Sequence, residues 1–272
     1  MLKVKNKTSN AKKSTQITLN FIASMMTISQ FLVRTLHISF ENANLLVLQK
    51  KVKVNGQFAQ LNQQIDKYDP IYCQDIQLQK GIQPIYFAFY KPVGVECTHN
   101  ETIPGNLVYF LRTQAKFISD SHSPYHLSTL LNQHLFPIGR LDKASEGLLL
   151  LTNNGKLYQQ VASDQSYKEK EYIVQTQETI TPEQIQQLSE GVIILGNKKT
   201  RPAVVHLLTS NSFSIILTQG LNRQIRRMCH KVGLNVAMLK RIRISNLTLQ
   251  QLQPGEFRLL SEAEVDAIIS AN

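Results

Sequence analysis

The chain has 272 residues, of which 42% are hydrophobic and 18% are charged, so it can bury one large core or two smaller ones. Lysines and arginines exceed the acids by 11. This excess favours a polyanionic partner, with nucleic acid first and an anionic membrane second. The three cysteines are widely spaced and form no C-x-x-C ligand pair, which argues against a zinc site and against a disulfide framework. Such cysteines are typical of a cytoplasmic protein with reduced thiols.

The distribution of charge strengthens the case for nucleic acid. No acid precedes Glu41, and none occurs from Gly191 to Gly255, a stretch that carries ten lysines and arginines. A solvated surface normally mixes both signs, so this stretch predicts a continuous positive face. Chance in a lysine-rich chain is the competing explanation. We favour a nucleic-acid footprint because such footprints are usually this asymmetric.

Residues 1–26 predict a flexible basic tail. An uncharged stretch from Ser14 to Val33 follows two lysines and resembles a signal peptide. Polar residues interrupt its apolar run and no small-x-small cleavage site follows, so we expect neither a secretory signal nor a membrane span. A transit peptide is a weaker alternative, because the first arginine is Arg34.

Residues 27–80 predict a small independent domain. The apolar residues of ISQFLVRTL recur at helical spacing, and Ser39 can cap a second helix that runs to Leu48. The stretch VKVNGQFA predicts a strand, an Asn-Gly hairpin turn and a second strand. YDPIYCQDIQL adds a turn and one more strand. Two helices and a small sheet match the size of an independent module.

Residues 84–272 predict a second domain, of the α+β class, after a linker at 80–84. The stretches IYFAFYKPVGVECT, EYIVQT and FSIILTQG predict strands. Thr181 can cap a helix that runs to Glu190 with a proline in its first turn. Residues 111–135 are rich in Ser, His, Gln and Asn, and predict an inserted loop.

Asp142 is the first candidate for chemistry. In PIGRLDKASEGLLLLTNNG it lies between Arg140 and Lys143, which would favour its charged form and lower its pKa. Such a carboxylate suits a nucleophile or a base better than an acid. Gly139 and Gly147 could expose it on a tight loop, and the final Asn-Asn-Gly predicts a hairpin turn. From local spacing alone, a salt-bridged aspartate at a strand entrance is the simpler explanation.

A second candidate region is TQGLNRQIRRMCHKVG, residues 218–233. Its apolar residues recur at i, i+3, i+4 and i+7, which predicts a helix that Gly233 ends. Arg223, Arg226 and Arg227 lie about one turn apart at the start of this helix. No acid lies near them in sequence, so phosphate or a catalytic carboxylate would satisfy them. A solvated basic face is the alternative.

Two strands carry further candidates. The strand KRIRISNLTL follows the helix and would point three cations toward the same polyanion: Lys240, Arg241 and Arg243. Tyr172 opens the strand of KEKEYIV, where a tyrosine is usually half-buried core. Beside a nucleic-acid site it could instead stack on an unpaired base. From spacing alone the core interpretation is favoured.

Three motifs in order, KPVG, GRLDKASEGLLLLTNNG and LNRQIRRM, resemble those of the RsuA-type pseudouridine synthases. The segment QGLNRQIRRMC is most similar to the sequences of the RluF-like branch, which modifies large-subunit ribosomal RNA. The resemblance extends from Phe87 to Leu260. It implies a mixed, mostly antiparallel sheet with flanking helices, a central RNA cleft, no cofactor and no metal.

The resemblance also assigns roles. It implies that Asp142 is the nucleophile, that Tyr172 packs on the target base and that Arg226 pairs with Asp142. Leu239 falls where the family places an apolar residue against the active site. Lys91, in the KPVG motif, joins the cations expected to contact RNA, which are Arg140, Lys143, Arg223, Arg227, Lys240, Arg241 and Arg243.

The module at 27–80 resembles the small RNA-binding domain first described in ribosomal protein S-four. It departs from that pattern at the start of its second helix, where SFENAN replaces the usual run of basic residues. RNA binding by this module would then shift toward Lys50, Lys51 and Lys53.

Together these features predict an RNA pseudouridine synthase for large-subunit ribosomal RNA, with transfer RNA as a second candidate substrate. We expect a monomer that does not bind membranes. Two alternatives remain at this point: an RNA-binding protein that kept the fold and lost catalysis, and a structural ribosome-assembly factor.

Overall fold

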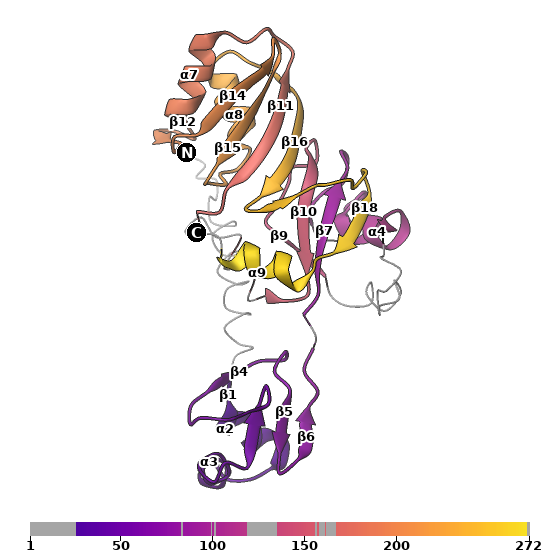
Figure 1. Cartoon of the computed structure of the whole chain (residues 1–272), viewed down its shortest axis with the longest axis vertical. Helices are drawn as coiled ribbons and strands as arrows, with labels where there is room; N and C mark the ends of the chain where they lie inside the picture. Colours follow the sequence, from indigo (N-terminus) through magenta and orange to yellow (C-terminus); the bar gives the residue numbers. More distant parts are fainter. Residues whose placement is uncertain are drawn as a thin grey trace, which may run out of the picture. The chain divides into compact units, whose positions relative to one another are not determined.

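The computed structural model describes residues 26–270 except 83, 99, 101, 119–134, 156, 158–160 and 162–166. Within it the chain forms two compact units that divide between Pro84 and Ile85 (Figure 1). The expected basic tail lies, apart from Met26, outside the described residues. No helix in the described part of the chain is both long and apolar enough to cross a membrane.

The first unit combines two helices with a four-stranded sheet in the order β3-β2-β5-β6. As predicted, Ser39 caps the second helix: its hydroxyl accepts a hydrogen bond from the Asn42 amide. The helices and strands are α2 (Ile28–Leu36), α3 (Phe40–Leu48), β2 (Val52–Val54), β3 (Gln57–Phe58), β5 (Ile71–Cys73) and β6 (Ile76–Gln79), with a separate pair of β1 (Met26–Thr27) and β4 (Gln64–Ile65).

One prediction for this unit is wrong in detail. We expected a single strand in YDPIYCQDIQL, and the structure has two, β5 and β6. Gln74 and Asp75 both adopt positive φ, at 49° and 66°, and reverse the chain between them. Aspartate tolerates this left-handed backbone better than most residues, which is why a tight turn forms inside the expected strand.

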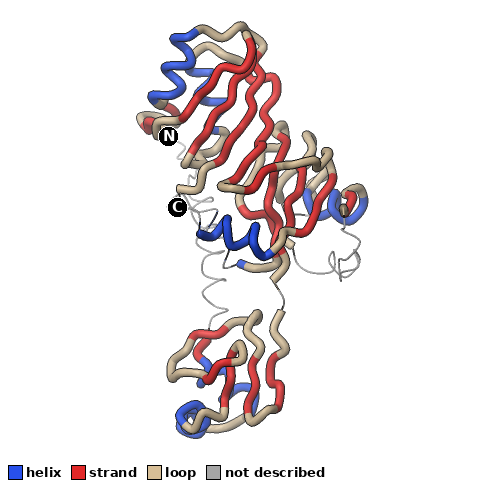
Figure 2. Tube along the Cα trace, viewed as in Figure 1, coloured by secondary structure: helices blue, strands red, loops and turns tan. Residues whose placement is uncertain are grey.

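The second unit is built on one extended sheet whose strands lie side by side (Figure 2). Its order is β14-β15-β11-β16-β10-β7-β18-β8, with β17 on β16 and β9 on β10. The strands are β7 (Tyr86–Lys91), β8 (Lys116–Phe117), β9 (Phe136–Ile138), β10 (Glu146–Thr152), β11 (Lys170–Thr176), β14 (Val204–Thr209), β15 (Ser212–Leu217), β16 (Val236–Ile244), β17 (Leu247–Thr248) and β18 (Glu256–Leu259).

Most strand pairs in this sheet are antiparallel, and the pairs β10–β16 and β8–β18 are parallel. The mixed, mostly antiparallel sheet that the resemblance implied is therefore confirmed. Helices α7 (Pro182–Glu190) and α8 (Gln224–Lys231) pack near β14 and β16, respectively. The remaining elements are α4 (Leu107–Thr113), α9 (Glu262–Ser270) and the small pair β12 (Ile193–Ile194) and β13 (Lys198–Lys199).

The four leucines of β10 explain why the sheet is covered on both faces. Leu149 and Leu151 belong to one buried cluster with phenylalanines of β7 and β18. Leu148 and Leu150 belong to another cluster on the opposite side. Successive side chains of a strand point to opposite faces, so a continuous apolar run requires a core on each.

Two predictions for this unit need correction. The expected loop at 111–135 contains the end of α4 and all of β8, while residues 119–134 lie outside the described part. The Asn-Asn-Gly after β10 does not close a hairpin, since β10 pairs with the preceding strand β9 and Gly155 is helical. The Asn153 side chain instead accepts a hydrogen bond from the Ile85 amide, which anchors the start of the unit.

Candidate active site

Asp142 lies in the loop that joins β9 to β10. The neighbouring Leu141 is buried in the core and anchors the loop, while the Asp142 side chain keeps 29% of its surface exposed. The Ser145 amide donates to the Asp142 carbonyl at 3.0 Å, and the Gly94 amide donates to the Lys143 carbonyl at 2.8 Å. The carboxylate is therefore presented to solvent by a loop whose backbone is fixed at several points.

Gly147, in β10 just after this loop, allows the backbone of β10 to approach that of β16 closely. It lies between Lys91 of β7 and Arg241 of β16 in the sheet register. Its φ is +108°, and a Cβ at this position would lie 2.2 Å from the Arg241 carbonyl oxygen. Only glycine fits such a close approach of two backbones. Of the two glycines that flank Asp142 in the sequence, Gly147 is therefore required by its close contact with the backbone of β16.

The buried side chain of Arg241 connects Tyr172 to the Asp142 loop. Its side chain is 3% exposed, and its Nε donates to the Leu148 carbonyl at 2.7 Å. Its Nη1 donates to the Arg140 carbonyl at 3.4 Å and to the Tyr172 hydroxyl at 3.5 Å. The expectation that Arg241 faces an RNA surface is wrong, because the protein buries this guanidinium as an internal donor.

Lys91 is a second buried cation, next to Gly147 in the register. Its side chain is fully buried, and its Nζ donates to the carbonyls of Pro92 and Val95 at 2.8 and 2.7 Å. Burial lowers the pKa of Lys91 to about 8, although the nearby carboxylates of Asp142 and Glu146 act in the opposite direction. Lys91 is thus not at the surface where we expected it to contact RNA.

The start of α8 supplies the cations at the carboxylate. Arg223, whose φ is +50°, precedes the helix, and its Nη1 lies 3.8 Å from Asp142 Oδ2. Arg226 donates from Nη2 to the Ala144 carbonyl at 2.8 Å and from Nη1 to the Val236 carbonyl at 3.2 Å. The expected pair between Arg226 and Asp142 is not formed. Arg226 holds the backbone of the Asp142 loop, and Arg223 faces the carboxylate.

The cations of β16 are engaged by the protein to different degrees. Lys240 Nζ lies 4.8 Å from the centre of the Tyr90 ring. Arg243 donates to Glu171 at 2.7 Å and to Glu169 at 3.0 Å, so it is an ion-paired residue rather than a free RNA contact. Burial acts to lower the pKa of Arg243, yet the hydrogen bonds to these two carboxylates raise it overall.

The remaining predicted site residues lie in the loop, in α8 and in β16. Arg140 and Lys143 are exposed on either side of Asp142. Arg227 donates to the carbonyl and the side chain of Asn222 at 3.0 and 3.2 Å. Leu239 is buried opposite Val174, in the same apolar cluster against which Tyr172 packs. The structure therefore brings Asp142, Tyr172 and the arginines of α8 to one region of the sheet.

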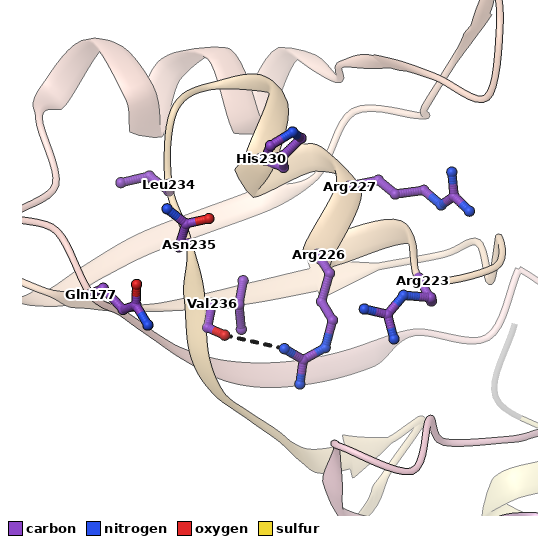
Figure 3. Close-up of a pocket in the computed structure, with 8 residues that line it drawn as sticks. All are labelled: Gln177, Arg223, Arg226, Arg227, His230, Leu234, Asn235 and Val236. Atoms are coloured by element: carbon purple, nitrogen blue, oxygen red, sulfur yellow. Dashed lines mark hydrogen bonds between the residues drawn. The ribbon is translucent and has the colours of Figure 1, made fainter.

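A pocket of about 440 Å³ opens beside α8 (Figure 3). Its lining residues are Gln177, Arg223, Arg226, Arg227, His230, Leu234, Asn235 and Val236. The sequence analysis missed Gln177, His230 and Asn235. Gln177 follows β11 and Asn235 precedes β16, so only the pairing of these two strands brings them together.

The described part of the chain contains no cluster of His, Cys, Asp or Glu that could hold a metal ion. Its polar site is made of one carboxylate, one tyrosine and several guanidinium groups. Such a set suits nucleophilic or base chemistry on an anionic substrate.

Comparisons with known proteins identify the family. Residues 85–231 match the family model described as RNA pseudouridylate synthase. The dual-specificity RNA pseudouridine synthase RluF of Escherichia coli strain K12 is 36% identical over 229 residues, which cover 84% of this chain and 72% of RluF. The ribosomal small subunit pseudouridine synthase A of Haemophilus influenzae is 26% identical over 247 residues, covering 90% of this chain and 100% of the relative.

A solved structure gives the same result. The crystal structure of a pseudouridylate synthase superposes with a TM-score of 0.59 at 26% identity, covering 89% of this chain and 99% of that one. The chain belongs to the RNA pseudouridylate synthase family, as an enzyme of the RsuA/RluF type. It is an isomerase that acts on RNA, which confirms the enzyme that the motifs predicted.

Proposed function

We propose that this enzyme isomerises a specific uridine of large-subunit ribosomal RNA with Asp142 as its nucleophile. The observation that carries the proposal is the geometry of Asp142. Its carboxylate is partly exposed on a fixed loop, 3.8 Å from a guanidinium of Arg223. An exposed carboxylate held in place in this way can reach a substrate atom without rearrangement of the loop.

The reaction requires no external reagent. The bond between N1 of uracil and C1′ of ribose breaks, the base turns, and a bond forms between C5 and C1′. The hydrogen of C5 leaves as a proton, and N1 takes up a proton, so atoms and electrons balance within the nucleotide. Asp142 would attack either the sugar or the ring, and both routes fit a single carboxylate. We therefore propose a reaction without cofactor or metal.

The other residues would hold the substrate. We propose that Tyr172 packs on the target base, since one guanidinium nitrogen of Arg241 donates both to its hydroxyl and to the Arg140 carbonyl beside Asp142. Extruding a uridine from folded RNA costs on the order of a few kcal/mol. Phosphate contacts from the exposed cations Arg140, Lys143 and Arg223, and from the half-buried Arg227, would offset that cost. Arg226 would hold the Asp142 loop against α8 through its hydrogen bond to the Ala144 carbonyl.

The choice of RNA is a separate part of the proposal. The resemblance of QGLNRQIRRMC to the RluF-like branch is the argument for large-subunit ribosomal RNA. The words "dual-specificity" in the name of the relative RluF suggest a second RNA substrate, for which we propose transfer RNA. We propose that residues 27–80 are an S-four-type RNA-binding domain, followed in the sequence by a catalytic domain at 84–272. Its exposed Lys50 and Lys51 and its half-buried Lys53 would touch RNA. We further propose that the enzyme acts as a monomer.

Tritium release tests the proposal directly, because the reaction expels the hydrogen of uracil C5. Wild type, Asp142→Asn and the control Asp266→Asn, an exposed acid of α9, would be incubated with C5-tritiated ribosomal or transfer RNA. We expect release by wild type and control on large-subunit RNA, and a rate at least about a thousandfold lower for Asp142→Asn. Equal release by Asp142→Asn would refute the role of Asp142. Release on transfer RNA alone would refute the target.

A further inference from the structure

The pocket beside α8 is lined by two chemically different walls. Arg223 and Arg227 lie on one side in Figure 3, and Gln177 and Asn235 lie on the other. Val236 and the buried Leu234 add apolar atoms to the lining. A volume of about 440 Å³ falls within the range of roughly 300–1,000 Å³ that is typical of small-molecule sites. Cations facing neutral amides suit a ligand that has an anionic part and a polar, planar part.

The positive charge of this pocket is incompletely balanced by the protein. Arg226 donates to the carbonyls of Ala144 and Val236, and Arg227 donates to the carbonyl and amide oxygens of Asn222. All of these acceptors are neutral. Burial lowers the pKa of Arg226 and the positive charge of Arg223 lowers it further, while the Asp142 carboxylate acts in the opposite direction without restoring it. A phosphate group would supply the missing negative charge.

The pocket is continuous with the catalytic loop. Arg223 both lines the pocket and faces Asp142 at 3.8 Å. Arg226 connects the two through its guanidinium, with one nitrogen on Val236 of the pocket and the other on Ala144 of the loop. A ligand in the pocket therefore lies next to the substrate at Asp142. The polyanion that reaches both places is one RNA strand.

Gln177 is placed to recognise a base. It follows β11 and is exposed, and its side-chain amide makes no hydrogen bond to the rest of the described chain. Its amide offers one donor and one acceptor side by side, the pattern that hydrogen-bonds the edge of a nucleobase. Asn235 is less available, since its amide nitrogen donates to Glu178 at 2.7 Å. Guanidinium planes on the other side can stack on an unpaired base.

We propose that this pocket binds a second unpaired nucleotide of the substrate RNA, adjacent to the target uridine. Gln177 reads the edge of its base, and Arg223 and Arg227 bind its phosphate. The inference rests on the proposed function and deepens it, because it makes the identity of a flanking nucleotide a determinant of substrate choice. Single-stranded loops are the usual targets of base-specific RNA recognition.

The test measures binding without turnover. Full-length protein carrying Asp142→Asn would be titrated with hairpin RNAs whose loop contains one uridine, flanked on its 5′ or 3′ side by each of the four nucleotides. Gln177→Ala and Arg227→Met would be added separately. Gln187→Ala, an exposed glutamine of α7, and Lys231→Met, at the end of α8, are matched controls outside the pocket.

We expect one flanking nucleotide to be preferred and Gln177→Ala to weaken its binding about tenfold while the other three change little. Arg227→Met should weaken all RNAs alike and reduce the slope of log affinity against log salt by about 0.7, the contribution of one phosphate on a single strand. The controls should match the parent. A preference that survives Gln177→Ala, or no preference in the parent, would overturn the proposal. A failure of the isomerisation would appear instead as wild type without tritium release.

Discussion

Helix α8 and strand β16 each contribute three cations within a few residues, yet the fold treats them differently. The arginines at the start of α8 reach the pocket and the Asp142 loop, and Arg223 is half exposed. On β16, Arg241 is buried as an internal donor and Arg243 is paired with two glutamates. In sequence both segments predict an RNA-binding face.

The difference shows that a basic stretch is not the same as a basic surface. The strand β16 lies in the interior of the sheet between β11 and β10, and both neighbours supply acceptors: the Leu148 carbonyl of β10 for Arg241 and the Glu171 carboxylate of β11 for Arg243. Arg223 precedes α8 and Arg227 lies within it, outside the sheet, and both side chains line the pocket. Arg241 and Arg243 therefore serve structure, while Arg223 remains available to a ligand.

The largest effect that would sharpen this contrast is expected for Arg241→Met. The Tyr172 hydroxyl and the Arg140 carbonyl would lose a shared donor, and a displacement of about 1 Å at a reacting group can cost about a hundredfold in rate. Steady-state tritium release should show kcat about a hundredfold lower with KM within about twofold. Arg227→Met should show the reverse, with KM about tenfold higher and kcat little changed. The same kinetic pattern in both variants would break the contrast.

An intermediate effect is expected from the other buried cation, Lys91. Its folded-state pKa of about 8 lies below the 10.5 of an unperturbed lysine, so the unfolded chain binds more protons between these pH values. Stability should therefore rise with pH across this window, by up to about 3 kcal/mol from this group. Tyr90 and Cys229 have raised pKa values and act in the opposite direction.

Urea unfolding of wild type and Lys91→Met at several pH values separates these contributions, since both proteins keep Tyr90 and Cys229. The free energy of unfolding of wild type, relative to that of Lys91→Met, should increase as the pH rises above about 8. A difference that is independent of pH would mean that Lys91 is not held in a desolvated site.

The smallest effect is expected for Arg243→Met. Its ion pairs with Glu169 and Glu171 are partly exposed, and such pairs contribute about 1 kcal/mol or less. RNA affinity and its salt dependence should stay at the wild-type values, because the guanidinium is already occupied. If the salt slope fell as for Arg227→Met, β16 would after all belong to the RNA-binding face.

Helix caps, the buried face of α8 and the enzyme family all follow from the order of residues along the chain. Ser39 and Thr181 cap helices as predicted, and the apolar periodicity of α8 places Ile225, Met228 and Cys229 in the core. These features depend on interactions within one or two turns, which composition and spacing encode directly. The motif order gave the family for the same reason, since it is a property of the chain alone.

Tertiary structure decided which side chains meet. It set Arg223 rather than Arg226 at the Asp142 carboxylate, buried Arg241 and Lys91, and brought Gln177 and Asn235 to one pocket. Each of these outcomes depends on strand order and register between segments that are distant in the sequence. A sequence pattern predicts the face of a helix or strand on which a residue lies. Which residues that face contacts depends on how the strands pair when the sheet assembles.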